Sequence, residues 1–252
     1  MAIIFHLIRA NGLVWSILYL AERVFKSPSI TDKRLKYERT NSLPGFNTVR
    51  YNHKEWDAYD WSQRGEEWSD SKAWKASLIE NVLLPFLHEG QTILEIGPGG
   101  GRWSTVLAKS ARRLILVDIT ENALAACKEN LSGFTNVEYF MNHGSNLEFI
   151  PNDSIDLVWS FDVFVHISPR DTEGYLAEIA RVLNSSGVAI IHYPAEGGIH
   201  GGFRSSVTND FFASSLARVN LKVVQRISAW GQRKEHSVDL YKDSISIVCR
   251  ES

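Results

Sequence analysis

The chain is 252 residues long, with a formal net charge of −2, 44% hydrophobic residues and 22% charged residues. That size suits one α/β domain with an appended segment and leaves little room for two separate enzymatic domains. Basic and acidic residues are mixed along the chain without a basic stripe, which argues against a nucleic-acid partner. The two cysteines, Cys127 and Cys249, form no CxxC pair or metal knuckle and fit a reducing, cytoplasmic setting.

Residues 1–26 are apolar around most of a helical wheel and are interrupted by Arg9 and Glu22. The charge-free stretch between these two residues is well short of the roughly 20 residues that a spanning helix needs, and no small-residue cleavage site follows. We therefore expect a helix that packs against the domain or a second subunit, or that lies on a membrane surface. The first alternative allows a homo-oligomer, and the second a peripheral location at the inner membrane face.

Residues 27–87 form a second segment, a Trp-rich preface that resembles a lid. Pro28, Pro44 and Gly45 are expected to break any long element before about Asp70, and residues 71–87 read as a helix. Four of the eight tryptophans fall in one short stretch, at positions 56, 61, 68 and 74. Plain hydrophobic packing over the domain is one expectation for such a cluster, and contact with a ligand is the other.

Strand and helix patterns alternate regularly through residues 88–252. The predicted strands are 92–96, 113–118, 137–141, 155–160, 188–193, 222–228 and 245–249, and the predicted helices are 103–110, 121–131, 169–183 and 207–219. Because no helix separates the last two strands, they predict a terminal antiparallel hairpin. The pattern as a whole predicts a Rossmann-like α/β fold with a seven-stranded, mostly parallel sheet and helices on both faces. Its binding crevice is expected at the carboxyl ends of the strands.

The first of these strands runs into a glycine-rich turn with the sequence LEIGPGGGR, residues 94–102. A turn between strand and helix brings backbone amides close to a ligand. The GxGxxG motif of dinucleotide-binding proteins needs a small residue at the place of its third glycine. Arg102 stands there if the count starts at Gly97, and Ser104 if it starts at Gly99. Glu95 would repel a pyrophosphate and suits a cofactor with an ammonium and a sulfonium group. The turn therefore favours S-adenosylmethionine over a nicotinamide cofactor.

Asp118 ends the second strand, where an acid would hold a ribose diol by two hydrogen bonds. Thr120 already caps the following helix, so Asp118 is not needed there. The polar residues after the third strand stand where an adenine edge would lie, although an ordinary polar turn has the same composition. The candidate cofactor-binding residues are Glu95, Gly97, Gly99, Arg102, Asp118, Ile119, Asn142, His143, Gly144 and Ser160.

Four segments taken in order resemble the class I methyltransferase family across about residues 85–250: LEIGPGGGRW, LVDIT, IDLVWSFDVFVHI and YLAEIARVLNSSGVAIIHY. The preface WDAYDW, residues 56–61, with GEEW, residues 65–68, is similar to a bacterial subgroup associated with cell-surface polysaccharide or sugar modification. In that subgroup the fifth strand tends to end in His-His-Ser-Asn, whereas residues 191–195 here read IHYPA. The resemblance implies S-adenosylmethionine as cofactor and methyl transfer as the reaction.

Methyl transfer to oxygen is an in-line displacement, so an enzyme mainly aligns the acceptor and excludes water. An alcohol must also lose its proton, and the pKa of histidine suits that task. His166 after the fourth strand and His192 at the end of the fifth are the candidate bases. Asp162 is a candidate to orient His166 or, as the alternative, to hold a divalent metal together with it. One Asp and one His make an incomplete ligand set, so no metal-binding residues are predicted.

The sequence thus predicts O-methylation of a hydroxyl on a sugar, a cell-surface glycan or another small molecule. The candidate acceptor-binding residues are Tyr59, Trp61, Trp68, Asp162, Tyr193 and Arg204. A lipid-like or quinone acceptor at the membrane is the first alternative and would explain the apolar N-terminus. A cofactor-binding but inactive partner subunit and a nicotinamide oxidoreductase are the other two.

Overall fold

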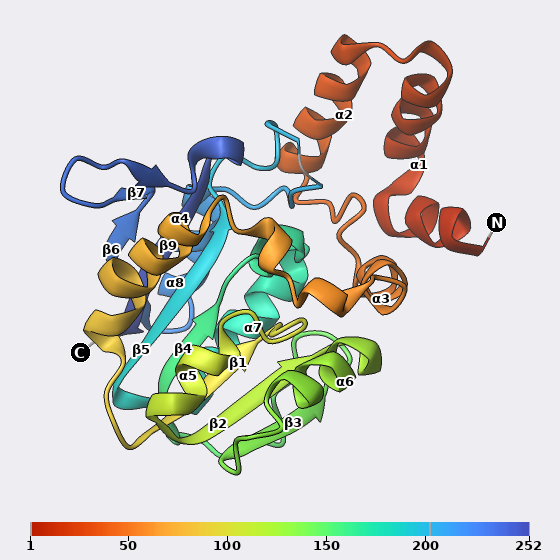
Figure 1. The fold of residues 1–252 in the computed structure, drawn as a ribbon. Helices are drawn as coiled ribbons and strands as arrows, with labels where there is room; N and C mark the ends of the chain where they lie inside the picture. The colour runs from red at the N-terminus through yellow and green to blue at the C-terminus, as the bar shows by residue number, and fades with distance from the viewer. Residues whose placement is uncertain (1, 202, 252) are drawn as a thin grey trace.

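The computed structural model describes residues 2–201 and 203–251, and a seven-stranded sheet forms its centre (Figure 1). The strand order is β3-β2-β1-β4-β5-β9-β6. The strands are β1 Gln91–Ile96, β2 Ala111–Asp118, β3 Val137–Met141, β4 Ile155–Ser160, β5 Leu183–Pro194, β6 Leu221–Ile227 and β9 Asp243–Arg250. The first five pair in parallel, and β9 runs antiparallel to both β5 and β6. The predicted Rossmann-like sheet with its terminal antiparallel hairpin is confirmed.

Helices cover both faces of this sheet. They are α4 Lys72–Leu78, α5 Ser104–Ser110, α6 Glu121–Asn130, α7 Pro169–Val182 and α8 Asn209–Ala217. The predicted starting signals act as expected, since the Thr120 side chain accepts a hydrogen bond from the backbone N of Ala123 and the Ser168 side chain accepts one from that of Asp171. Short ribbons β7 Ala229–Trp230 and β8 His236–Ser237 pair separately beside the main sheet.

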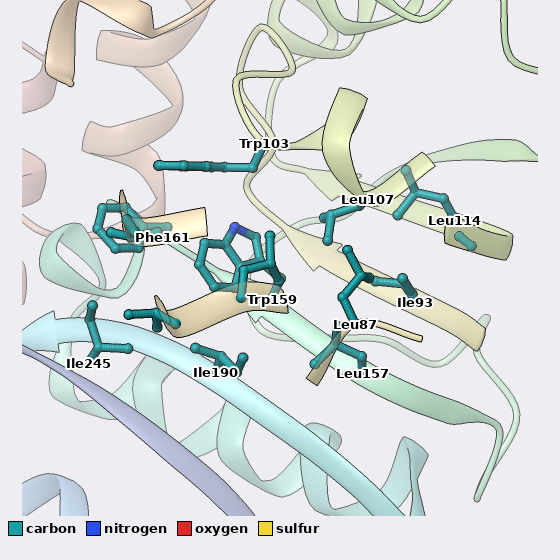
Figure 2. Packing of buried hydrophobic residues seen from close by; sticks show 14 of the residues in the cluster. Leu87, Ile93, Trp103, Leu107, Leu114, Leu157, Trp159, Phe161, Ile190 and Ile245 are labelled. Atoms are coloured by element: carbon teal, nitrogen blue, oxygen red, sulfur yellow. The ribbon is translucent and has the colours of Figure 1, made fainter. Parts of the chain in front are cut away.

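Successive residues of β1 point to opposite faces and enter different cores. Ile93 belongs to the core under α4, α5 and α6, in which Trp103, Trp159 and Phe161 pack together (Figure 2). Leu94 belongs to the core under α7 and α8. Because both faces are buried, apolar residues occupy the middle of the central strands, as Ile93 and Leu94 do in β1 and Leu157 and Val158 in β4. The carboxyl edge of the strands is therefore the part of the sheet left to meet a ligand.

The N-terminal third holds more helix than the sequence predicts. Residues 27–70 were expected to be irregular, yet α2 spans Pro28–Thr40 and α3 spans Val49–Asp57. The expectation was wrong for Pro28 because this proline occupies the first helical turn, where its missing N–H has no partner to lose. The helix expected over 71–87 changes after α4 into a π-helical turn, Ile79–Leu83, and a 3-10 turn, Leu84–Phe86. Further 3-10 turns are Trp61–Gln63, Glu66–Trp68, Phe164–His166 and Asp239–Tyr241.

The first helix, α1, spans Ala2–Phe25 and pairs with α2 as a hairpin that projects from the domain (Figure 1). Gly12 interrupts it with φ 82° and ψ 178°, values outside the helical region. Within the described residues α1 is the one helix long and apolar enough to cross a membrane. Length and composition alone decide that test, and core helices and signal sequences pass it too.

Candidate active site

A pocket of about 890 Å³, its open part included, lies at the carboxyl edge of β1, β2 and β4. Its floor comes from the glycine turn and the residues that follow β2 and β4. Its cover comes from α3 and the two 3-10 turns after it. Ten of the predicted site residues line it: Trp61, Trp68, Gly97, Gly99, Arg102, Asp118, Ile119, Gly144, Asp162 and His166. The sequence therefore places most of its candidates on one cavity.

The glycine turn needs glycine for conformation and for space. Gly97 and Gly99 have φ of 69° and 54°, in the left-handed region. A Cβ on Gly97 would come within 2.4 Å of Val163, and one on Gly99 within 2.5 Å of Trp61. The turn is thus closely covered by residues of the β4 end and of the lid, which leaves backbone facing the pocket.

Asp118 lies at the pocket wall and is almost completely buried. Its Oδ1 accepts hydrogen bonds from the backbone N and the hydroxyl of Thr120 at 3.0 and 3.2 Å, and its Oδ2 accepts one from the backbone N of Gly99 at 3.4 Å. Burial raises the pKa of this carboxyl above its ordinary value, although these hydrogen bonds oppose the shift. A buried acceptor in this position fits a ribose diol.

Glu95 lies behind the turn and is not among the residues that line the pocket. Its Oε2 accepts a hydrogen bond from the Ser104 hydroxyl at 2.5 Å, and the side chain is buried. Burial raises the pKa of Glu95 to about 8. The carboxyl is thus mostly neutral at pH 7, which corrects the expectation that Glu95 is an anion that repels a pyrophosphate. A cationic group nearby would favour its ionised form.

Arg102, which is buried, forms an ion pair inside the pocket with the partly buried Asp162, with Nη2 and Oδ2 2.5 Å apart. Burial alone would raise the pKa of Asp162, but Arg102 and His192 outweigh it and hold that pKa far below its ordinary value. The Nη1 of Arg102 is buried and has no hydrogen-bond partner in the described part of the chain. Such a free donor fits a carboxylate on a ligand. Together with Asp118 and the glycine turn, it fits the carboxylate, ribose and methionine parts of S-adenosylmethionine.

His166 lines the pocket at the end of the 3-10 turn after β4. Its Nδ1 is 2.8 Å from the carbonyl oxygen of Phe203, which can only accept, so Nδ1 carries the proton and Nε2 keeps its lone pair. Its ring packs between Trp56 and Phe203, at 5.3 Å from each. Burial lowers the pKa of His166 to about 4, so this histidine is neutral at physiological pH.

His192 is buried and does not line the pocket. Its ring stacks on Phe161 at 4.3 Å and lies between two carboxylates, 3.1 Å from Asp162 and 3.4 Å from Asp243. Burial lowers the pKa of His192, but hydrogen bonds and attraction to the two carboxylates outweigh it and raise that pKa above the ordinary value. The structure therefore places His192 behind Asp162, as a group that holds this aspartate.

Four aromatic side chains of the lid, Trp56, Tyr59, Trp61 and Trp68, pack against one another with ring centroids 5.0 to 6.3 Å apart. The three tryptophans line the pocket. Tyr59 does not, and its hydroxyl donates to Glu67 at 2.6 Å. Packing and ligand contact thus apply to different members of the cluster.

The remaining candidates lie apart from the pocket. Tyr193 is buried on the α8 side, where its hydroxyl bonds Asn209 at 2.8 Å, and Arg204 pairs with Asp243 at 3.0 Å. Asn142 and Ser160 are buried and bonded to backbone carbonyls, and His143 is exposed beside a neighbouring cavity. In the ranges that the structure describes, no three His, Cys, Asp or Glu side chains gather in a way that would hold a metal ion.

Several residues in or beside the pocket were not among the predicted site residues. Asn52 and Trp56 line the pocket from α3, four residues apart on one face of a helix that was not expected. The amide of Asn52 donates to the carbonyl of His166. Phe203, on the loop after β5, supplies the carbonyl that fixes His166. No sequence signal connects Phe203 to His166, since 37 positions separate them.

Residues 93–187 match a family model described as a methyltransferase domain. Phosphoethanolamine N-methyltransferase 3 of Arabidopsis thaliana is 36% identical over 110 residues, which are 41% of this chain and 22% of that protein. A probable S-adenosylmethionine-dependent methyltransferase of Mycobacterium tuberculosis is 33% identical over 102 residues, 40% of this chain and 35% of that protein. The chain thus aligns with about a third or less of each of these relatives.

Solved structures share the fold. A TehB-like SAM-dependent methyltransferase from Corynebacterium glutamicum has a TM-score of 0.57 and 20% identity, covering 81% of this chain and 98% of that one. Phosphoethanolamine N-methyltransferase 1 of Haemonchus contortus, in complex with phosphoethanolamine and S-adenosylhomocysteine, has a TM-score of 0.61 and 18% identity, covering 81% of this chain and 50% of that one.

Residues 93–187 thus match a methyltransferase domain, and the fold around them is the one that solved S-adenosylmethionine-dependent methyltransferases share. These matches support S-adenosylmethionine as the cofactor of this domain. The predicted enzyme class and cofactor are confirmed. The link to sugar or polysaccharide modification stays a prediction.

Proposed function

We propose that the chain is an O-methyltransferase that methylates a hydroxyl of a sugar, a cell-surface glycan or another small molecule. One observation carries the proposal. His166 lines the pocket as a neutral imidazole, with Nδ1 bonded to the Phe203 carbonyl and the Nε2 lone pair left for an acceptor. A neutral imidazole with a free lone pair can accept a hydroxyl proton, and its low pKa means that the proton moves only as the acceptor oxygen bonds to the methyl group.

Bound S-adenosylmethionine would supply an electrophilic methyl group on its sulfonium. Asp118 would hold its ribose and Arg102 its carboxylate, while the tryptophans of the lid would exclude water. As the methyl group passed from sulfur to the acceptor oxygen, the hydroxyl proton would move to Nε2 of His166. The carbonyl of Phe203 keeps the imidazole oriented throughout. Because burial disfavours the imidazolium, His166 passes this proton to solvent when the pocket opens.

A second acceptor class is favoured by the relatives, several of which are named phosphoethanolamine N-methyltransferases. An amine acceptor would also lose a proton to a neutral imidazole. Its phosphate would need a cationic partner, and Arg102 with its free Nη1 is the candidate in the pocket. Under this alternative Arg102 serves the acceptor instead of the cofactor.

The test is methyl transfer from radiolabelled S-adenosylmethionine to three acceptor sets: sugars and nucleotide sugars, phosphoethanolamine, and quinols in detergent. The proposal expects label on a hydroxyl of the first set, and the loss of labelling in His166→Ala. Labelling of phosphoethanolamine alone would replace it by N-methylation. Labelling of quinols alone would favour the lipid-like acceptor. S-Adenosylhomocysteine binding without any labelled acceptor would favour an inactive partner subunit. The cytoplasmic location and a homo-oligomer stay predictions.

A further inference from the structure

The second half of α1 carries an apolar stripe that nothing in the domain covers. Leu13, Ile17, Leu20 and Val24 follow one another at helical spacing, and their exposed fractions run from 56% to 76%. Phe5, before the break at Gly12, and Phe25, at the end of the helix, are exposed as well. Soluble domains seldom leave so many large apolar side chains together in water, so the stripe indicates a contact surface.

The opposite face of α1 is fixed to the rest of the protein. Trp15 donates to Glu38 of α2 at 2.5 Å, and the amide of Asn11 donates to the carbonyl of Gly45 at 2.8 Å. His6 lies 3.1 Å from the hydroxyl of Thr48, the residue that caps α3. These contacts hold the helix at a set rotation, with its stripe turned outward and its first turns joined to the lid.

The hairpin carries a charge opposite to that of the whole chain. Residues 2–40 hold seven Lys and Arg against three Asp and Glu, whereas the chain has a net charge of −2. Two of the three acids, Glu22 and Glu38, pair with Arg34. The exposed cations of the hairpin are Arg9, Arg23, Lys26, Lys33 and Lys36. An apolar stripe beside free cations complements a bilayer with anionic headgroups.

We propose that the α1–α2 hairpin docks on a bilayer that contains anionic lipid, with the second half of α1, after Gly12, lying in the interface plane. A spanning orientation would carry the polar groups of Asn11, Glu22 and Arg9 into the hydrocarbon region, where they are costly. A second copy of the hairpin is a poorer occupant, because face-to-face packing would bring like charges together. The docking does not depend on the acceptor, so it is tested separately from the proposed reaction.

The experiment is co-sedimentation of the full chain with vesicles of phosphatidylcholine, with or without phosphatidylglycerol. We expect binding to the mixed vesicles, weaker binding to phosphatidylcholine alone and loss of binding at high salt. The triple variant Leu13→Gln, Ile17→Gln, Leu20→Gln should weaken vesicle binding by at least about tenfold, since three apolar side chains no longer leave water. The matched control replaces Val224 and Leu240, two exposed apolar residues outside the hairpin, by Gln.

Vesicle binding that is lost in the triple variant and kept in the control supports the docking. Absent binding by the wild-type chain, or equal binding by both variants, would overturn it. If sedimentation equilibrium shows that the wild type is a dimer and the triple variant a monomer, the stripe binds a second copy of the chain instead of a bilayer. An S-adenosylhomocysteine titration of the triple variant should match that of the wild type, which shows that the variant folds and keeps its cofactor pocket.

Discussion

The pKa values of the acidic side chains shift in opposite directions on the two sides of the pocket edge. On the β1–β2 side, burial raises the pKa of Glu95 and of Asp118, which receive hydrogen bonds but form no ion pair with any described residue. On the β4–β5 side, Asp162 is only partly buried, and Arg102 and His192 hold its pKa far below the ordinary value. The comparison teaches that a buried group's partners, and not burial alone, decide its charge. On the cofactor side, a bound cation would favour the ionised forms of Glu95 and Asp118. On the acceptor side, the charge of Asp162 is already balanced by Arg102.

The same contrast separates the two histidines. His192 faces two carboxylates and its pKa rises, whereas His166 faces aromatic rings and a carbonyl and its pKa falls to about 4. Only His166 lines the pocket. The acceptor half therefore divides its histidines into one base that is neutral and one positioning group for Asp162.

The largest expected effect is on His166. His166→Ala should lower turnover by roughly 10² to 10⁴ with cofactor affinity nearly unchanged, because a base acts on the acceptor proton. In the wild type the rate should show no limb from this group near pH 6.5 and should fall only as pH drops through about 4. Steady-state kinetics across pH measures both. If the wild-type rate falls near pH 6.5 and this pH dependence is absent in His166→Ala, the pKa of His166 is not lowered by burial. If His192→Gln loses turnover and His166→Ala keeps it, His192 is the base and His166 is not.

Asp118→Ala should be next in size. Loss of charge-assisted hydrogen bonds to the ribose should weaken S-adenosylhomocysteine binding by about 1.5 to 3 kcal/mol. Calorimetric titration measures the change. Asp156→Ala is the control, because the Asp156 carboxylate accepts hydrogen bonds from Thr92 and Asn184 and does not line the pocket. Equal affinities of wild type and Asp118→Ala would remove Asp118 from the cofactor site.

Glu95→Gln sharpens the comparison through stability. The folded pKa of Glu95 is raised to about 8 from 4.5, so the folded protein holds a proton that the unfolded chain releases. This contribution is complete below about pH 4.5 and is lost as pH rises to about 8. Glu95→Gln removes the loss and should be more stable than the wild type at pH 7.5 by at least about 1 kcal/mol, with a much smaller difference at pH 5. Urea unfolding at pH 5 and 7.5 measures it. A variant that is less stable at both values would contradict a neutral Glu95.

The smallest expected effect is the pH dependence due to His192. Its folded pKa is raised, so its contribution to stability is complete below about pH 6.5 and is lost as pH rises through the folded value. His192→Gln should flatten this part of the unfolding profile and leave S-adenosylhomocysteine affinity unchanged. An unchanged profile would show that the two carboxylates do not bind an imidazolium.

Periodicity in the sequence was enough to predict the sheet and to place the glycine turn and Asp118 beside one pocket, because strand ends and glycine turns are local features. The acceptor side depends on which face each residue of β5 meets. His192 and Tyr193 are neighbours in the chain, yet one turns toward Asp162 and the other toward Asn209 on the opposite face. The bond between His166 and Phe203 depends on a loop that the sequence does not position. Pro28 was misread because a proline both breaks helices and begins them.

The most direct test of the central claim, that the pocket holds S-adenosylmethionine, is a pair of calorimetric titrations of the full chain. One uses S-adenosylhomocysteine and the other NAD, under the same buffer and salt. The pocket described above predicts a micromolar or tighter constant for S-adenosylhomocysteine and no measurable heat for NAD. Binding of NAD without S-adenosylhomocysteine would contradict the assignment of the glycine turn, Asp118 and Arg102 to this cofactor.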